Sequence, residues 1–169
     1  RDWSSDVCSS DLLHKRIQFE EAGGISRAKA VDGFRIGQGS KRLFILGKPG
    51  VGKTTFLHYL VLQAAKGTIP LIPIFIQLND LNREKFSFDE YIAREFDVCQ
   101  FPDVSPFVKE LLENGKAIVF FDGLNEVPNK NNERSRLILQ IKNFVEKYDL
   151  CRHVITSQNS DSFHFGHFH

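Results

Sequence analysis

The sequence is poor in cysteine, carries almost no net charge and contains no long hydrophobic run. Its cysteines, Cys8, Cys99 and Cys151, are too few and too scattered for a disulfide framework or a metal site. A formal net charge of +1 gives no electrostatic argument for nucleic acid or an anionic membrane as partner. No apolar run approaches the ~20 residues needed to cross a bilayer. A reducing, cytoplasmic location is the default expectation.

The most informative stretch is a glycine-rich segment that begins at residue 47. The apolar run Leu43–Leu46 before it predicts a buried strand of a parallel sheet, and a helix is predicted from Lys53. Between them stands the full pattern G-x-x-x-x-G-K-T, which is typical of a loop that cradles phosphates with backbone N–H groups. The predicted nucleotide-binding residues are Gly47, Lys48, Pro49, Gly50, Val51, Gly52, Lys53, Thr54 and Thr55.

Three of these residues have predicted chemical roles. Lys53 can place its ammonium between the β- and γ-phosphates, and it is therefore also a candidate catalytic residue. The hydroxyl of Thr54 can bind Mg²⁺, and Thr55 is expected near the α-phosphate. The expected ligands are ATP or GTP together with Mg²⁺, and the alternative is a glycine-rich turn that matches the pattern by chance.

A second group of candidate residues follows the apolar run Ile118–Phe121, which predicts another buried strand. Asp122 stands at the carboxyl end of this strand, beside the place where the phosphate loop is expected to open, and can hold Mg²⁺. A turn-forming acid at a strand end is the alternative. If the chain turns at Gly123, Glu126 can approach the water that attacks the γ-phosphate, which makes it the candidate for water activation.

The remaining patterns predict an α/β fold, a P-loop NTPase with three layers (α/β/α) and a mostly parallel sheet that is incomplete at its C-terminal end. Helices are predicted from Lys53 to the break at Gly67, from Ser87 through Phe96, and over Ser105–Leu112 and Glu133–Tyr148, and further strands over Leu71–Leu78 and Val154–Thr156. Ser87 and Glu90 form a capping pattern. Pro73 lies within the strand Leu71–Leu78 and indicates an outermost strand, because proline cannot donate to the ladder.

The two ends of the chain are interpreted separately. Residues 1–12 resemble one reading frame of a sequencing-adapter oligonucleotide, which indicates an assembly artefact; a disordered polar leader is the alternative. Residues 13–40 form an N-terminal flanking segment without assigned chemistry. Residues 159–169 are interpreted as a truncated tail, in which His164, His167 and His169 could instead bind a metal. Residues 41–158 are left as the nucleotide-binding domain.

Four segments together resemble the NACHT domain, a branch of the signal-transduction ATPases (STAND) within the P-loop superfamily. They are GKPGVGKTT, IPLIPIFIQLNDL, KAIVFFDGLNEVP and HVITSQ, between about Lys41 and Ser160. In the discriminating DGLNE segment, Asp122, Gly123, Leu124 and Glu126 match the family pattern, whereas Asn125 replaces an acidic residue. Gln158 stands where the family often has an arginine that senses the γ-phosphate. Both departures favour binding over fast hydrolysis, because neither side chain carries the family's charge.

The resemblance implies a nucleotide-operated switch that exchanges ADP for ATP, self-associates within the complete protein and activates an attached effector. In bacteria such proteins serve in defence against phage, and in animals in innate immune signalling. The effector and sensor domains are expected outside this chain, which we therefore interpret as a fragment. Two alternatives stay open: a module that binds nucleotide with little hydrolysis, and a generic P-loop ATPase or kinase.

Overall fold

The computed structural model describes residues 40–81, 87–98, 103–128 and 132–158. The interpretations of residues 1–39 and of the histidine-containing tail lie outside these ranges. The strands are β1 (Arg42–Leu46), β2 (Ile72–Gln77), β3 (Ala117–Asp122) and β4 (Arg152–Ser157), and the helices are α2 (Lys53–Ala65), α3 (Phe88–Val98), α4 (Val104–Glu113) and α5 (Glu133–Lys147). The strands and helices predicted within these ranges are confirmed, with small differences at their ends.

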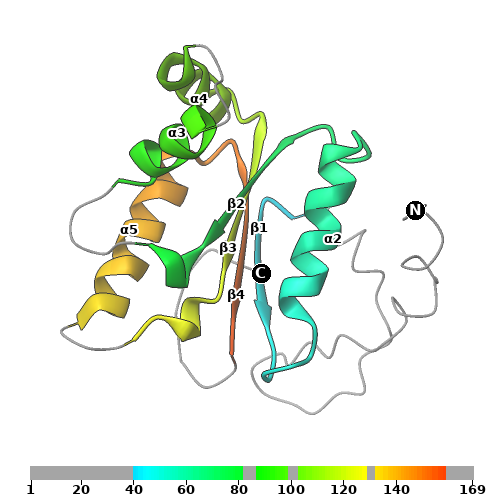
Figure 1. The fold of residues 1–169 in the computed structure, drawn as a ribbon, viewed down its shortest axis with the longest axis vertical. Helices are drawn as coiled ribbons and strands as arrows, with labels where there is room; N and C mark the ends of the chain where they lie inside the picture. Colours follow the sequence, from blue (N-terminus) through cyan, green and yellow to red (C-terminus); the bar gives the residue numbers. More distant parts are fainter. Residues whose placement is uncertain (1–39, 82–86, 99–102, 129–131, 159–169) are drawn as a thin grey trace.

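The four described strands form one sheet in the order β1-β4-β3-β2, and every pair is parallel. The sheet is therefore wholly parallel in the described part of the chain, where the sequence predicts a mostly parallel one. Pro73 lies in β2, the strand at one end of this order, as predicted from its missing N–H group. The last of the described strands, β4, lies between β1 and β3, so the chain returns to the middle of the described sheet (Figure 1).

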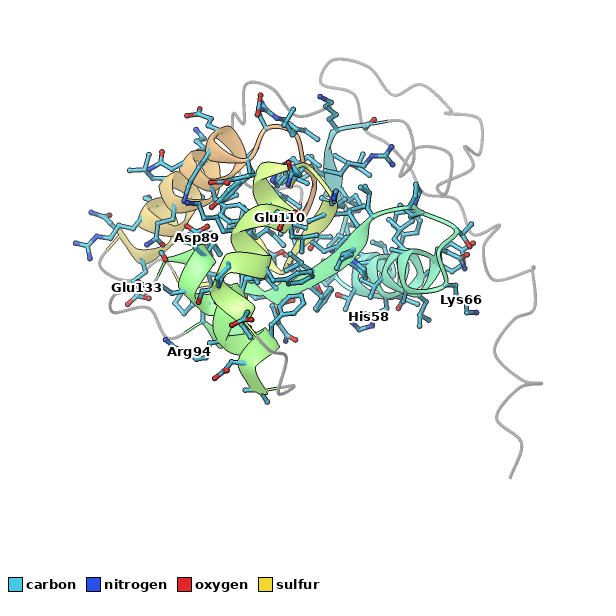
Figure 2. The ribbon with its side chains drawn as sticks, turned by 90° about the horizontal axis from the view of Figure 1, so that it is seen from above. His58, Lys66, Asp89, Arg94, Glu110 and Glu133 are labelled. Atoms are coloured by element: carbon cyan, nitrogen blue, oxygen red, sulfur yellow. The ribbon has the colours of Figure 1, made fainter. Side chains whose placement is uncertain are left out.

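Helices cover both faces of the sheet, which confirms the three-layer architecture. On one face, Leu57 and Leu60 of α2 pack into a cluster that contains Ile118 and Phe120 of β3. On the other face, α3, α4 and α5 contribute to a second cluster, which includes Phe121. Figures 1 and 2 show α2 on the side of the sheet opposite α3, α4 and α5. Among the described helices, none is long and apolar enough to span a membrane.

The beginning of α3 is fixed both locally and to the end of α5. The amide of Glu90 donates to the Ser87 hydroxyl at 3.2 Å, which is one half of the predicted capping pattern. Asp89 accepts hydrogen bonds from the Tyr148 hydroxyl and, at 3.0 Å, from the Lys147 ammonium. Burial and the bond to Asp89 both raise the pKa of Tyr148. This cluster therefore ties together two helices that lie far apart in the sequence.

His153 in β4 is a buried titratable group in the core. Its side chain is fully buried, and its ring meets that of Phe144 edge to face, with 6.1 Å between centroids. Neither ring nitrogen has a hydrogen-bond partner among the described residues. Burial, followed by the nearby charge of Arg42, lowers the pKa of His153 from 6.5 to about 3. The folded protein therefore holds this imidazole neutral.

This histidine predicts a loss of stability as the pH falls from 6.5 towards 3. Over that range the unfolded chain binds a proton at His153 and the folded chain does not, so acid favours unfolding. At pH 5 we expect the free energy of unfolding to be about 2 kcal/mol lower from this group alone. Urea titrations at pH 7 and pH 5 measure the difference, which His153→Leu should remove. An equal loss in both proteins would contradict the assignment.

Candidate nucleotide-binding site

The phosphate-loop motif lies in the structural context that the motif requires. β1 ends at Leu46, the loop covers residues 47–52, and α2 begins at Lys53. Two loop residues have positive φ angles, +77° at Gly50 and +92° at Gly52, which side chains with a Cβ rarely adopt. The predicted sequence of strand, glycine-rich turn and helix is therefore present.

The first turn of α2 faces the loop with features that suit an anion. The amide of Phe56 donates to the Gly52 carbonyl at 2.9 Å, which closes the first turn of the helix. The amides before Phe56 in this turn have no acceptor within the helix, because the helix has no residue four positions earlier. The turn carries no acidic residue, so nothing in it offsets the positive end of the helix dipole. Thr54 and Thr55 are exposed in this turn. Their hydroxyl groups are accessible at the end of the helix where phosphates bind.

The ammonium group of Lys53 is held against the loop. It donates to the carbonyl oxygen of Gly47 at 2.8 Å and to that of Lys48 at 3.1 Å. The positive charge therefore lies at the beginning of the loop rather than in bulk solvent. A phosphate bound by the loop amides would lie close to this ammonium, in agreement with the role predicted for Lys53 from the motif.

Asp122 ends β3 and lies on the same face of the sheet as α2. Side chains alternate along a strand, and Ile118 and Phe120 pack on the α2 side, so Asp122 points to that side as well. Asp122 is buried, with 6% of the residue exposed. The loop follows β1 and Asp122 ends β3, so both lie at the carboxyl edge of the parallel sheet. β3 does not pair directly with β1, because β4 lies between the two strands.

Thr156 of β4 contacts the end of β3. The register pairs Phe121 with Ile155, which brings Thr156 opposite Asp122. The Thr156 hydroxyl donates to Asp122 Oδ1 at 2.5 Å and accepts from the amide of Gly123 at 3.0 Å. Sequence reasoning missed this contact because it depends on strand order. The available signal was the alternation of β4, which places Val154 and Thr156 on the same face.

The end of β4 also contacts the beginning of the phosphate loop. The amide of Gly47 donates to the carbonyl oxygen of Ser157 at 3.2 Å. Gln158 follows directly and is partly exposed. The carboxyl end of β4 is therefore bonded to the loop on one side and to Asp122 on the other.

The turn on which the interpretation of Glu126 depends is present. Gly123 has φ +78°, and the short 3-10 helix η3 (Leu124–Glu126) follows, with the amide of Glu126 donating to the Gly123 carbonyl at 2.9 Å. A Cβ on Gly123 would lie 3.1 Å from Glu126 Oε2, so the carboxylate folds back over the end of β3. Glu126 is exposed, whereas Asp122 is buried. Its role towards water stays a prediction.

Arg134, near the start of α5, holds the same turn from the other side. Its Nε donates to the carbonyl of Val127 at 2.9 Å, and its Nη2 donates to that of Asn125 at 3.1 Å. The guanidinium of Arg134 therefore holds the backbone on both sides of Glu126, at Asn125 and at Val127. No sequence pattern singled out Arg134, because the contact joins two elements through a turn.

The oxygen ligands at this site fit Mg²⁺. The cation is usually bound through one or two carboxylates together with phosphate oxygens and waters, and rarely by an all-protein cage. Asp122 and Thr54 are oxygen donors of this kind, at the same edge of the sheet as the loop. No group of three or more His, Cys, Asp or Glu side chains that could hold a metal occurs among residues that the structure describes. When bound, Mg²⁺ would neutralise charge on the phosphates.

Comparison with known proteins agrees with this geometry. A sequence model of the NACHT domain matches residues 41–165 of the 169. No individual curated protein and no solved structure matched the chain. The match covers most of the sequence and contains the phosphate loop, Asp122 and the end of β4. The chain belongs to the NACHT domain family and is a nucleotide-binding NTPase module with the α/β fold of P-loop NTPases.

Proposed function

We propose that this chain is the ATP-dependent switch module of a signalling protein and that it hydrolyses ATP slowly. The observation that supports this most is the set of hydrogen bonds at the end of β4. They join Gly47, at the start of the phosphate loop, to Asp122 through Ser157 and Thr156. The residues predicted to bind phosphate and Mg²⁺ thereby belong to one connected edge of the sheet.

The proposed roles follow from the chemistry of each group. Lys53 binds the β- and γ-phosphates, and Thr54 and Asp122 hold Mg²⁺. Glu126 orients the attacking water, since it is exposed and its carboxylate lies against Gly123, the residue that follows Asp122. Gln158 can donate a hydrogen bond to the γ-phosphate but cannot neutralise developing charge, which supports slow turnover.

A switch requires that the γ-phosphate hold two parts of the protein in one arrangement. In this chain the carboxyl end of β4 is the element that contacts both the loop and the acidic turn, so a γ-phosphate bound by Gln158 would act on both. We propose that the complete protein uses this change to self-associate and to control an attached effector, in defence or signal transduction. The cytoplasm is the proposed location.

We expect Glu126→Gln to lower the rate of phosphate release from ATP at least tenfold, since general-base catalysis contributes about 10²–10⁴-fold and the amide cannot accept the proton. ATP affinity should stay within about twofold, because the substitution keeps the size of an exposed side chain. Malachite-green phosphate assays and calorimetric titration with ATP measure the two quantities.

Glu110→Gln is the matched control, because Glu110 is exposed on α4, away from the α2 face of the sheet (Figure 2). Equal rates for the wild type and the Glu126 variant would remove Glu126 from the mechanism. Tight ATP binding without phosphate release from the wild type would instead favour a binding-only module, which the uncharged Asn125 and Gln158 already suggest as the second candidate.

A further inference from the structure

We propose that Thr156 is a positioning residue for the Mg²⁺ site: its hydroxyl fixes the Asp122 carboxylate in the orientation in which it meets the cation or a water bound to it. The inference rests on the proposed function, because it assigns a partner to the carboxylate that would hold the metal. It adds to that function a residue outside the loop and the acidic turn.

The geometry fixes the direction of the Thr156 hydroxyl. A hydroxyl carries one hydrogen, and here that hydrogen is donated to Asp122 Oδ1 at 2.5 Å. Its oxygen accepts the amide of Gly123 at 3.0 Å, which orients the lone pairs. Thr156 is also fully buried. Its Cβ carries both a methyl group and the hydroxyl group, and this branching restricts the χ1 rotamer of the side chain. The hydroxyl therefore cannot donate to another acceptor without losing its bond to Asp122.

The same bond determines how the carboxylate can meet a cation. It occupies one acceptor position of the carboxylate and fixes the plane of the group, and the remaining oxygen positions would hold Mg²⁺ or a water bound to it. Asp122 is almost fully buried and lies at the end of β3. The pairing of β3 with β4 extends to Phe121, the residue before it, and so holds the backbone at this point. Partners that orient a metal ligand commonly change metal affinity by about 10–100-fold when they are removed. We therefore expect the hydroxyl to matter for Mg²⁺ rather than for ATP alone.

A purely structural role for Thr156 makes a different prediction. Buried carboxylates need hydrogen-bond partners, so the hydroxyl could serve only to satisfy Asp122 and the Gly123 amide. In that case its removal would lower the thermal stability but leave the Mg²⁺ dependence of ATP binding unchanged. A positioning role changes the Mg²⁺ dependence and leaves ATP binding in EDTA unchanged.

The experiment measures ATP binding to the purified chain by calorimetry over a series of Mg²⁺ concentrations and in EDTA. For Thr156→Val we expect the Mg²⁺ concentration at half-maximal effect to rise about tenfold, which corresponds to about 1.4 kcal/mol. Thr156→Ser keeps the hydroxyl and should behave like the wild type. Thr68→Val, at an exposed position after α2, is the matched control and should change nothing.

Two further variants keep the test decisive. Thr156→Ala removes the hydroxyl and, unlike Thr156→Val, puts no methyl group in its place. It replaces the valine variant if the melting curve shows that the valine variant does not fold. In an Asp122→Asn background, loss of the Thr156 hydroxyl should have no further effect on the Mg²⁺ dependence, because the charge that it positions is gone. An additional shift in that background would show that Thr156 acts by another route, which overturns the proposal.

The results separate this inference from the proposed function. If the wild type binds ATP with a clear Mg²⁺ dependence and the valine or alanine variant leaves that dependence unchanged, the positioning role is wrong and the function stands. If the wild type shows no Mg²⁺-dependent ATP binding, the proposed function itself fails. A restored Mg²⁺ response in Thr156→Ser, beside a shifted one in Thr156→Val, supports the positioning role.

Discussion

Replacing Lys53 by alanine should weaken ATP binding at least 100-fold. The ammonium lies against the loop, 2.8 Å from the carbonyl oxygen of Gly47 and 3.1 Å from that of Lys48, where a bound phosphate would meet it. Removing one partner of a charged, hydrogen-bonded pair costs about 2–5 kcal/mol, and about 2.7 kcal/mol corresponds to 100-fold in affinity. Titration calorimetry with ATP and Mg²⁺ measures the loss directly.

The control is Lys66→Ala, since Lys66 is an exposed lysine at the other end of α2 (Figure 2). Both variants lose one positive charge, so a difference between them reports the position of Lys53 and not the net charge. Melting curves without nucleotide should stay close to the wild type for both, while the rise in melting temperature caused by ATP should vanish only for Lys53→Ala. Unchanged ATP affinity in Lys53→Ala would mean that the loop does not bind the triphosphate.

Phe121→Ala should lower the free energy of unfolding by about 3–5 kcal/mol, the range for large aromatic residues in cores. Phe121 is fully buried in β3, and its ring lies edge to face with Phe88 at 5.2 Å and with Phe144 at 5.9 Å between centroids. One substitution therefore removes contacts of the sheet with both α3 and α5. Because native domains are stable by about 5–15 kcal/mol, the loss is a large part of the total.

Urea denaturation monitored by circular dichroism measures this loss. Leu139→Ala is the control, because Leu139 is an apolar residue of α5 that is 59% exposed, and its truncation should cost less than about 0.5 kcal/mol. If Phe121→Ala is unfolded in buffer, Phe121→Leu should still fold with a smaller loss. Equal stability of Phe121→Ala and Leu139→Ala would mean that this side chain is not part of the core between the sheet and the helices.

Local patterns predicted the elements of this fold well because each depends on residues close in sequence. The run at Ile118–Phe121 is a fully buried strand, and the run at Leu43–Leu46 is a strand in which Leu43 and Ile45 are buried and the other two residues half-buried. The capping pattern at Ser87 begins a helix. Pro73 indicated an outer strand because its effect on the hydrogen-bond ladder is local. The strand order was not accessible in this way, since parallel strands are joined by long crossovers that fit several orders.

In the candidate site too, residues that are close in sequence were predicted, and contacts between separate elements were not. The loop residues and the turn after Asp122 are contiguous in the sequence, and the motif spacing was enough to select them. Thr156 contacts residues that lie 34 and 33 positions away in the sequence, and Arg134 contacts residues that lie 7 and 9 positions away. These contacts follow no motif. They become visible only when β4 lies beside β3 and when α5 begins beside the acidic turn. The roles of Glu126 and Gln158 stay predictions, because they concern a bound nucleotide.

The sequence by itself determined that this chain has a phosphate loop between a strand and a helix, an acid at the end of a fully buried strand, and the motifs of a NACHT domain. These are short-range patterns in which residue type and spacing carry the chemistry. Only the tertiary structure decided that β4 lies between the loop strand and the acidic strand, and that Thr156 bonds to Asp122 and to the Gly123 amide. The physical reason is that strand order and the partner of a buried carboxylate depend on packing between segments distant in sequence, which no local spacing encodes.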